Sequence, residues 1–238
     1  MTLPERFSLA PHLRLVCFPS TCVVLDEEKG TVRILVEEAA RAVSDLSAAQ
    51  GEISVFESTP ERKRVLTALM DSGILGREYG PRGWDTVRRG VPSTPSWGTR
   101  DSPAALAPIP RVSLPWYLWG ALALFVVLIG SLRKHGNVFA RTRRLVRRAS
   151  AGATDHGSAV KAAYAVRKVG RLLPWRVACW EEATATVIAL RWSGHRSSFR
   201  HGVATDPVRL HAWVEVGGRP VAESDDITDY TPFEESDE

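Results

Sequence analysis

Residues 178–190 read Ala-Cys-Trp-Glu-Glu-Ala-Thr-Ala-Thr-Val-Ile-Ala-Leu, and residues 211–216 read His-Ala-Trp-Val-Glu-Val. The first stretch is typical of a helix over 177–192 with Cys179 near its start. A thiol in the first turn of a helix faces the positive end of the helix dipole, which favours the thiolate. Glu181 and Glu182 partly oppose this effect, so Cys179 needs a base to act as a nucleophile.

The second stretch is typical of a strand, and His211 is the candidate base. Alternation along a strand places His211, Trp213 and Glu215 on one face. A strand imidazole facing a helix-start cysteine is the arrangement of papain-like and transglutaminase-like enzymes, in which a carboxylate orients the imidazole. The same residues also fit an ordinary core, where a lone cysteine at a helix start and a strand histidine are common.

The carboxylate that could orient His211 is left open by the spacing. An ideal two-residue turn at Gly217-Gly218 would pair His211 with Ser224 and turn Glu223 to the opposite face. A bulge or a three-residue turn would instead bring Glu223 or Asp225 to the His211 face.

The surrounding pattern predicts a compact α+β domain from Ser158 onward. We expect helices over 159–172 and 177–192. Strands are expected over 199–204, 210–216 and 219–222, the last two joined by the glycine pair.

Residues 112–132 carry no charge, and seven arginines and lysines follow between Arg133 and Arg148. The apolar run meets the ~20-residue length of a membrane span, with aromatic residues at one end. A span would place the two halves of the chain on opposite sides of the membrane, although the N-terminal half has no export signal of its own. A buried or interfacial helix is the alternative, so the prediction is membrane association through 112–132 without a fixed topology.

Residues 1–80 predict a small winged-helix domain. Short strands are expected over 16–18 and 22–25, and a turn at 26–30 leads into a strand over 31–36. A helical stripe follows at 39–46, and a second helix starts at the capping signal 58–61 and ends at Gly73. Residues 81–114 are rich in proline, glycine and serine and predict a linker.

Charge and cysteine content bound the function further. The net charge is +4, with no carboxylate between Asp101 and Asp155 and eight from Glu223 to the C-terminus. The odd number of cysteines, three, predicts a reducing cytoplasm and no disulfide framework. Cys17 and Cys22 have no second Cys/His pair nearby, so we expect small apolar strand residues rather than metal ligands. No glycine-rich phosphate loop is present, and no cofactor is expected.

Three segments together resemble the transglutaminase-like leader peptidases of lasso-peptide biosynthesis: 173–182 around Cys179, 201–207, and 211–221 beginning His-Ala-Trp-Val-Glu. The resemblance spans roughly 115–233, including the apolar opening helix. It implies a Cys-His-Asp triad whose acid lies about a dozen residues after the histidine. Glu223 holds that place here, with Asp225 as its substitute.

Residues 12–78 resemble the PqqD-like elements that recognise leader peptides of ribosomally made, modified peptides. The resemblance rests on 24–35 and on the helix that ends at Gly73-Ile74-Leu75. In that family an extended leader adds a strand to the edge of the sheet. The resemblance implies a substrate-binding surface made of Thr31, Val32, Arg33, Ile34, Leu35, Arg62 and Leu66. The alternative is that the basic residues 62–64 form only a solvated face.

The sequence therefore predicts an α+β protein with a PqqD-like winged-helix domain over 1–80, a linker over 81–114 and a papain/transglutaminase-like domain over 115–238. The predicted function is a cytoplasmic cysteine peptidase, able to associate with a membrane, that removes the leader of a lasso precursor. Cys179 is the nucleophile, His211 the base and Glu223 the acid, without a metal. The implied partners are the precursor peptide and a macrolactam-forming lasso cyclase, with no nucleic acid. The alternatives are a transglutaminase-like acyltransferase, a non-catalytic membrane-associated peptide scaffold, and a nucleic-acid-binding protein.

Overall fold

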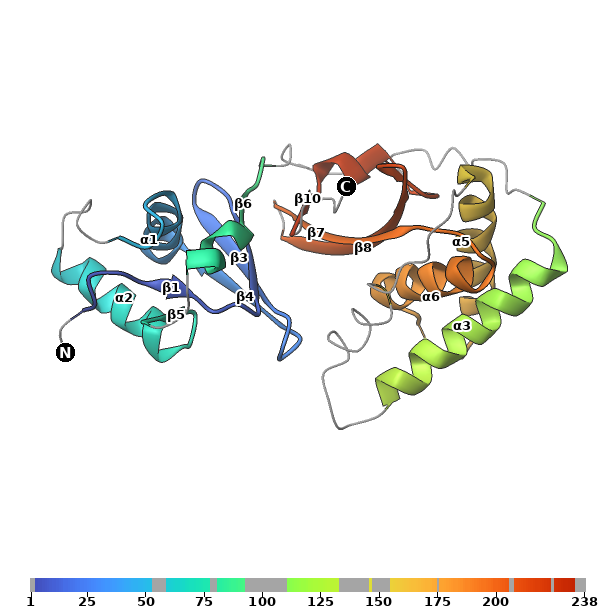
Figure 1. Ribbon diagram of the computed structural model, residues 1–238, viewed down its shortest axis with the longest axis horizontal. Helices are drawn as coiled ribbons and strands as arrows, with labels where there is room; N and C mark the ends of the chain where they lie inside the picture. Colours follow the sequence, from blue (N-terminus) through green and yellow to red (C-terminus); the bar gives the residue numbers. More distant parts are fainter. Residues whose placement is uncertain are drawn as a thin grey trace. The chain divides into compact units, whose positions relative to one another are not determined.

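The computed structural model describes residues 3–52, 59–77, 81–92, 111–132, 146, 155–174, 176–205, 208–223 and 225–233. Within these residues the chain is a mixed α+β structure (Figure 1). It divides into two compact units, which comprise mainly Met1–Pro92 and Ser93–Pro232. Each unit is described by itself.

The first unit is built on a four-stranded sheet with the order β4-β3-β2-β6. Strands β2 (Leu13–Cys17), β3 (Thr21–Asp26) and β4 (Thr31–Val36) are antiparallel, and β6 (Val87–Arg89) runs parallel to β2. Asp26 stabilises the β3–β4 turn, because its Oδ1 accepts hydrogen bonds from the N–H groups of Glu28 and Lys29 at 3.1 and 2.8 Å. The strand predicted over 31–36 is confirmed, and β4 is an edge strand.

Two helices of this unit share one hydrophobic core with the sheet. Helix α1 spans Glu37–Ala48 and helix α2 spans Pro60–Asp71. Thr59 caps α2, since its Oγ1 accepts a hydrogen bond from the Arg62 N–H at 3.2 Å, and Gly73 follows the helix with a positive φ of 72°. The predicted start and end of this helix are confirmed. Short strands β1 (Ser8–Leu9) and β5 (Leu75–Gly76) pair with each other.

The first residues of the predicted linker belong to this unit. The 3-10 helix η1 (Pro81–Thr86) leads into β6, and Trp84 is only 2% exposed. The Trp84 Nε1 donates a hydrogen bond to the carbonyl of Phe7 at 3.1 Å. A tryptophan that anchors in a distant part of the core thus outweighs the local turn-forming composition. Residues 93–110 of the predicted linker lie outside the described residues, and its last residue, Leu114, already begins the next helix.

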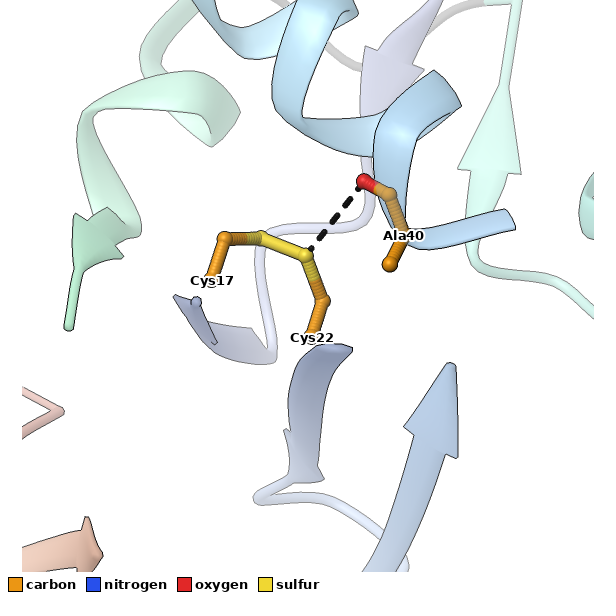
Figure 2. Close-up of a disulfide and its surroundings, with 3 residues drawn as sticks. All are labelled: Cys17, Cys22 and Ala40. Atoms are coloured by element: carbon orange, nitrogen blue, oxygen red, sulfur yellow. Dashed lines mark hydrogen bonds between the residues drawn. A yellow bond between two sulfur atoms is a disulfide. The ribbon is translucent and has the colours of Figure 1, made fainter. Parts of the chain in front are cut away.

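Cys17 and Cys22 are joined by a disulfide, so the expectation of two reduced strand cysteines was wrong (Figure 2). The two residues stand directly opposite each other where β2 turns into β3. The C-x4-C spacing is therefore that of a tight hairpin, which brings both sulfurs together. Cys22 Sγ lies 3.5 Å from the carbonyl oxygen of Ala40 on α1. A disulfide sulfur carries no proton, so this approach is a packing contact between hairpin and helix.

The second unit packs helices on an antiparallel sheet with the order β10-β7-β8-β9. The sheet comprises β7 (Ser198–Ala204), β8 (Arg209–Val216), β9 (Arg219–Pro220) and β10 (Thr231–Pro232). The helices are α3 (Leu114–Leu132), α5 (His156–Gly170) and α6 (Cys179–Trp192). The expected helices and the strands β7 and β8 are confirmed to within a few residues, whereas the last strand ends at Pro220 instead of 222.

Helix α6 is the central element of this unit. It shares one cluster of buried residues with α5 and β8, and a second cluster with α3 and α5. All residues from Ala183 to Leu190 are buried. Thr184 and Thr186 satisfy their buried hydroxyls within the helix, donating to the carbonyls of Trp180 and Glu182 at 2.6 and 2.8 Å. The core thereby fixes the axis of α6 and the position of its first residue.

Helix α3 covers the predicted apolar run. It buries Ala123, Leu124 and Val127 with α5 and α6. A second stripe of apolar side chains along the same helix is exposed: Leu114, Leu118, Leu122, Phe125 and Ile129. Among the helices in the described ranges, none has the length and hydropathy needed to cross a membrane. Interfacial membrane association stays a prediction.

Candidate active site

Cys179 is the first residue of α6, as the sequence predicts to within two residues. The backbone of Ala178 is extended, and its N–H donates a hydrogen bond to Glu181 Oε2 at 2.9 Å. Glu181 therefore caps the helix start, and its charge is used there. The Cys179 thiol is free and half-buried. Among the chain's three cysteines it is the one outside the disulfide.

His211 lies on β8, on the face that the alternation predicts. Its ring is nearly parallel to that of Trp213, with ring centres 6.2 Å apart and an angle of 12° between the planes. Trp213 Nε1 donates to Glu215 Oε1 at 2.9 Å, and Glu215 is paired with Arg200 at 3.0 Å. The ring beside His211 is thus itself held by a buried ion pair.

Glu223 reaches His211 by a route that strand pairing does not provide. Glu215 and Val216 pair with Pro220 and Arg219, which gives the ideal two-residue turn with both glycines at positive φ. The Val221 N–H still donates to the Val214 carbonyl at 2.9 Å. If the ladder continued, Glu223 would stand opposite Ala212 and point away from His211.

The residue that breaks the ladder is Ala222, whose φ is +55°. This left-handed conformation is uncommon for a non-glycine residue and redirects the chain. Glu223 Oε2 then lies 2.9 Å from His211 Nε2. The Gly217-Gly218 turn is therefore the ideal two-residue turn, without a bulge. The chain instead leaves the strand direction at Ala222, one residue before Glu223. Asp225 opens the 3-10 helix η2 (Asp225–Asp229), and its side chain is outside the described residues.

The thiol and the imidazole shift each other toward the charged pair. A hydrogen bond from His211 lowers the pKa of Cys179 below its ordinary 9.0, against burial, and the backbone N–H groups of Ala212 and Trp180 lower it further. Burial alone would lower the pKa of His211. The hydrogen bonds and charges of Cys179 and Glu223 outweigh it and raise that pKa to about 9. Since Nε2 faces Glu223, the other ring nitrogen is the one left for the thiol.

The three side chains line a cleft of about 290 Å³ together with Arg167, Glu182 and Trp213. Glu223 is only 11% exposed, and its second oxygen Oε1 lies 2.6 Å from Arg167 Nη2. Burial raises the pKa of Glu182, with the charge of Glu223 adding to the rise and Arg167 opposing it. Arg167 and His211 thus each hold one oxygen of the Glu223 carboxyl group. The cleft can therefore hold a thiolate, an imidazolium and an oriented carboxylate in one row.

The predicted substrate-binding residues lie in the first unit, on β4 and α2. Thr31, Val32 and Ile34 are exposed, while Arg33 and Leu35 are half-buried. Leu66 is buried in the core. Arg62 is paired with Asp45 at 2.6 Å and with Glu38 at 3.6 Å. Of the predicted surface, the residues of β4 are therefore accessible to a peptide, whereas Leu66 and Arg62 of α2 are largely occupied within the unit.

Sequence reasoning missed three residues around His211. Arg167 lies within the helix expected over 159–172, and no sequence signal links it to Glu223. Ala222 carries no signal for a positive φ. Tyr230 places its ring 5.4 Å from that of His211, and Arg209 lies over the Tyr230 ring.

Comparison with known proteins identifies the second unit. Residues 122–235 match the family described as the transglutaminase-like superfamily, which includes cysteine peptidases and acyltransferases. No curated protein and no solved structure shows a significant match to the chain. The matched segment contains Cys179, His211 and Glu223. Residues 122–235 of this chain therefore form a transglutaminase-like domain.

Proposed function

We propose that the protein is a cysteine peptidase that binds a precursor peptide and removes its leader during lasso-peptide biosynthesis. The observation that carries the proposal is the row formed by Cys179, His211 and Glu223 in the cleft. A thiolate beside an imidazolium, with a carboxylate behind it, is the arrangement that activates a sulfur nucleophile.

The chemistry follows from the positions of the three groups. The Cys179 sulfur bonds to the carbonyl carbon of the scissile peptide bond. The imidazolium of His211 gives its proton to the leaving nitrogen as the C–N bond breaks, which leaves a thioester. Water then attacks the thioester, with His211 taking a proton from it, and the carboxylic acid and the thiolate are released. The N–H of Cys179, in the first turn of α6, is a donor suited to the oxyanion.

Substrate recognition is assigned to β4. An extended peptide can add to an open sheet edge through main-chain hydrogen bonds, and exposed side chains beside the edge select its sequence. Val32, Ile34 and Val36 alternate along β4 and are 36, 50 and 55% exposed. Three exposed aliphatic residues on an edge strand are unusual in a soluble domain, because such edges invite pairing. A leader with apolar residues at every second position fits this edge.

The finer assignment to lasso peptides is supported by the sequence resemblance of 173–182, 201–207 and 211–221. It implies that the cleaved core passes to a cyclase that closes the macrolactam. The same row of residues would also serve an acyltransferase, in which an amine replaces water. The two reactions differ in product mass, since hydrolysis adds water and transfer adds the amine.

The test is mass spectrometry of a candidate lasso precursor peptide incubated with the full chain. Cys179→Ala and His211→Ala should abolish cleavage, because neither variant can form the thioester at a useful rate. His156→Ala, a histidine at the start of α5 that does not line the cleft, is the matched control. Full cleavage by folded Cys179→Ala would end the peptidase proposal. An amine adduct in place of the hydrolysed core would assign the acyltransferase instead.

A further inference from the structure

We propose that Arg167 is a positioning residue that holds both the backbone and the side chain of the Ala222–Glu223 turn, so that Glu223 faces His211. The effect of Arg167 on catalysis rests on the function proposed above. The effect of Arg167 on the Cys179 thiol is independent of that function, because it can be measured without substrate.

The guanidinium of Arg167 contacts two consecutive residues of the turn. Nη1 donates a hydrogen bond to the carbonyl of Ala222 at 2.5 Å, and Nη2 donates to Glu223 Oε1 at 2.6 Å. Arg167 comes from α5, which is fixed in the core because Ala163 is buried in one hydrophobic cluster and Val166 in another. The fork therefore connects a rigid helix to a segment that has left the ladder of the sheet.

The contact with Ala222 matters because that residue is the strained one. A left-handed conformation is strained for an alanine, so it persists only where neighbouring groups hold it. The Nη1 bond satisfies the Ala222 carbonyl and holds this residue where the chain leaves the strand. Without it, the extended conformation of Ala222 would return Glu223 to the opposite face.

The contact with Glu223 also decides which oxygen faces the imidazole. Oε1 is bound to Arg167 and Oε2 to His211, so the carboxyl plane is fixed from both sides. Arg167 also contacts a second carboxylate, because its Nε lies 3.4 Å from Glu182 Oε2. Arg167 therefore separates two carboxylates that would otherwise repel each other. A planar fork with several donors suits this site, and a lysine cannot reproduce it.

The variant Arg167→Lys separates positioning from simple charge, because it keeps the charge and loses the fork. If Arg167 acted only through its positive charge, its loss would raise the pKa of Cys179, but Arg167→Lys would leave that pKa at its wild-type value. If Arg167 positions Glu223, both Arg167→Met and Arg167→Lys release the carboxylate from His211, and the pKa of Cys179 rises toward its ordinary value of 9.0 in both.

The experiment measures the rate of Cys179 alkylation by iodoacetamide against pH in the full chain, kept non-reduced so that Cys179 is the reactive thiol. We expect Arg167→Met to raise the apparent thiol pKa by about one unit or more. Arg167→Lys should lie between Arg167→Met and the wild type, because it keeps the charge and loses the fork. Lys168→Met, the neighbouring cation over the ring of Tyr117, is the matched control and should leave the profile unchanged. On the precursor, Arg167→Met should lower kcat by about 10- to 100-fold with little change in KM.

An unchanged or lowered thiol pKa in folded Arg167→Met would overturn the positioning role. An Arg167→Lys profile identical to that of the wild type would also overturn it, because the charge alone would then suffice, whereas a raised thiol pKa in Arg167→Lys supports it. A wild-type protein that leaves the precursor intact would reject the proposed function, while the alkylation profiles would still decide the role of Arg167.

Discussion

Glu223 Oε2 lies 2.9 Å from His211 Nε2, although the hairpin register places Ala212, and not His211, opposite Glu223. The contact exists because Ala222 leaves the strand with a φ of +55°. A glutamate, with one methylene more than an aspartate, then spans the remaining distance. The relationship explains how a glutamate can contact His211 at a place where the resemblance to leader peptidases implies an aspartate.

Replacement of Glu223 tests its role as the acid. In Glu223→Gln the amide keeps the size of the side chain but loses the charge that stabilises the imidazolium. We expect kcat for precursor cleavage to fall by about 10²- to 10⁴-fold. Asp225→Asn is the matched control and should retain most of the activity. A dead Asp225→Asn beside an active Glu223→Gln would reassign the acid.

The strained turn can be tested at Ala222 itself. Ala222→Gly should be tolerated, because glycine adopts a positive φ at no steric cost and relieves about 1 kcal/mol of strain. Ala222→Val should lower both the thermal stability and the rate of thiol alkylation at neutral pH, since a β-branched residue disfavours this conformation strongly. Differential scanning fluorimetry and alkylation rates check the two effects. Equal behaviour of the valine and glycine variants would show that the turn does not depend on Ala222.

The thiol–imidazole pair predicts a defined pH dependence. The folded protein binds the His211 proton up to a pKa of about 9, whereas the unfolded chain releases it near 6.5. The stability contributed by His211 is therefore complete below pH 6.5 and is lost as the pH rises through about 9. The pKa of Cys179 is lowered, so its contribution is complete above 9.0 and is lost as the pH falls through that lowered pKa.

We expect alkylation of Cys179 to remain fast well below pH 9.0 in the folded protein and to slow in 8 M urea at the same pH. The melting temperature of the wild type minus that of His211→Ala should shrink between pH 6.5 and about 9. Identical alkylation profiles for folded and unfolded protein would contradict the ion pair.

The elements that carry the site could be predicted from sequence because their signals are local. The apolar run after Cys179 predicts a helix that is buried on most sides, and β8 shows its alternation directly. The glycine pair fits a two-residue turn, and both glycines do adopt a positive φ. Each of these signals lies within a few residues of the element that it predicts.

The remaining features could not be predicted because they depend on distant residues. Arg167 and Glu223 are separated by 56 positions, and nothing near either residue marks the pair. Trp84 ties η1 and the following β6 to the first unit by its hydrogen bond to the carbonyl of Phe7, 77 positions away. The Cys17–Cys22 disulfide was missed for a different reason. The odd number of cysteines argued against disulfides, whereas the hairpin register that joins these two becomes visible only with the strands in place.

The disulfide predicts the number of reactive thiols. Protein denatured without reductant should take up one alkyl group, at Cys179, and reduced protein should take up three. Reduction should lower the stability of the first unit by about 2 kcal/mol, since the bridge closes a short loop of the unfolded chain. Intact mass after alkylation measures the first effect and urea unfolding the second. Cys179→Ala should take up none before reduction, and three labels on the non-reduced wild type would contradict the bridge.

The last prediction concerns the edge strand β4. A proline at Arg33 would block strand addition, but Arg33 also donates a hydrogen bond to the Ser72 carbonyl at 3.0 Å, so that change would disturb the fold as well. Ile34→Asp is the sharper test. The side chain is half exposed, so a carboxylate is tolerated in the free protein, but it is costly to bury against an apolar ligand.

We expect Ile34→Asp to weaken binding of the labelled precursor peptide by about 10-fold or more, measured by fluorescence anisotropy with the full chain. The melting temperature should stay unchanged. Val91→Asp is the matched control, because Val91 is an exposed valine of the same unit outside the strands, and it should bind normally. Cys179→Ala should also bind normally, since recognition and chemistry are assigned to different units. Full affinity in folded Ile34→Asp would move leader recognition away from β4, to a surface that this edge does not include.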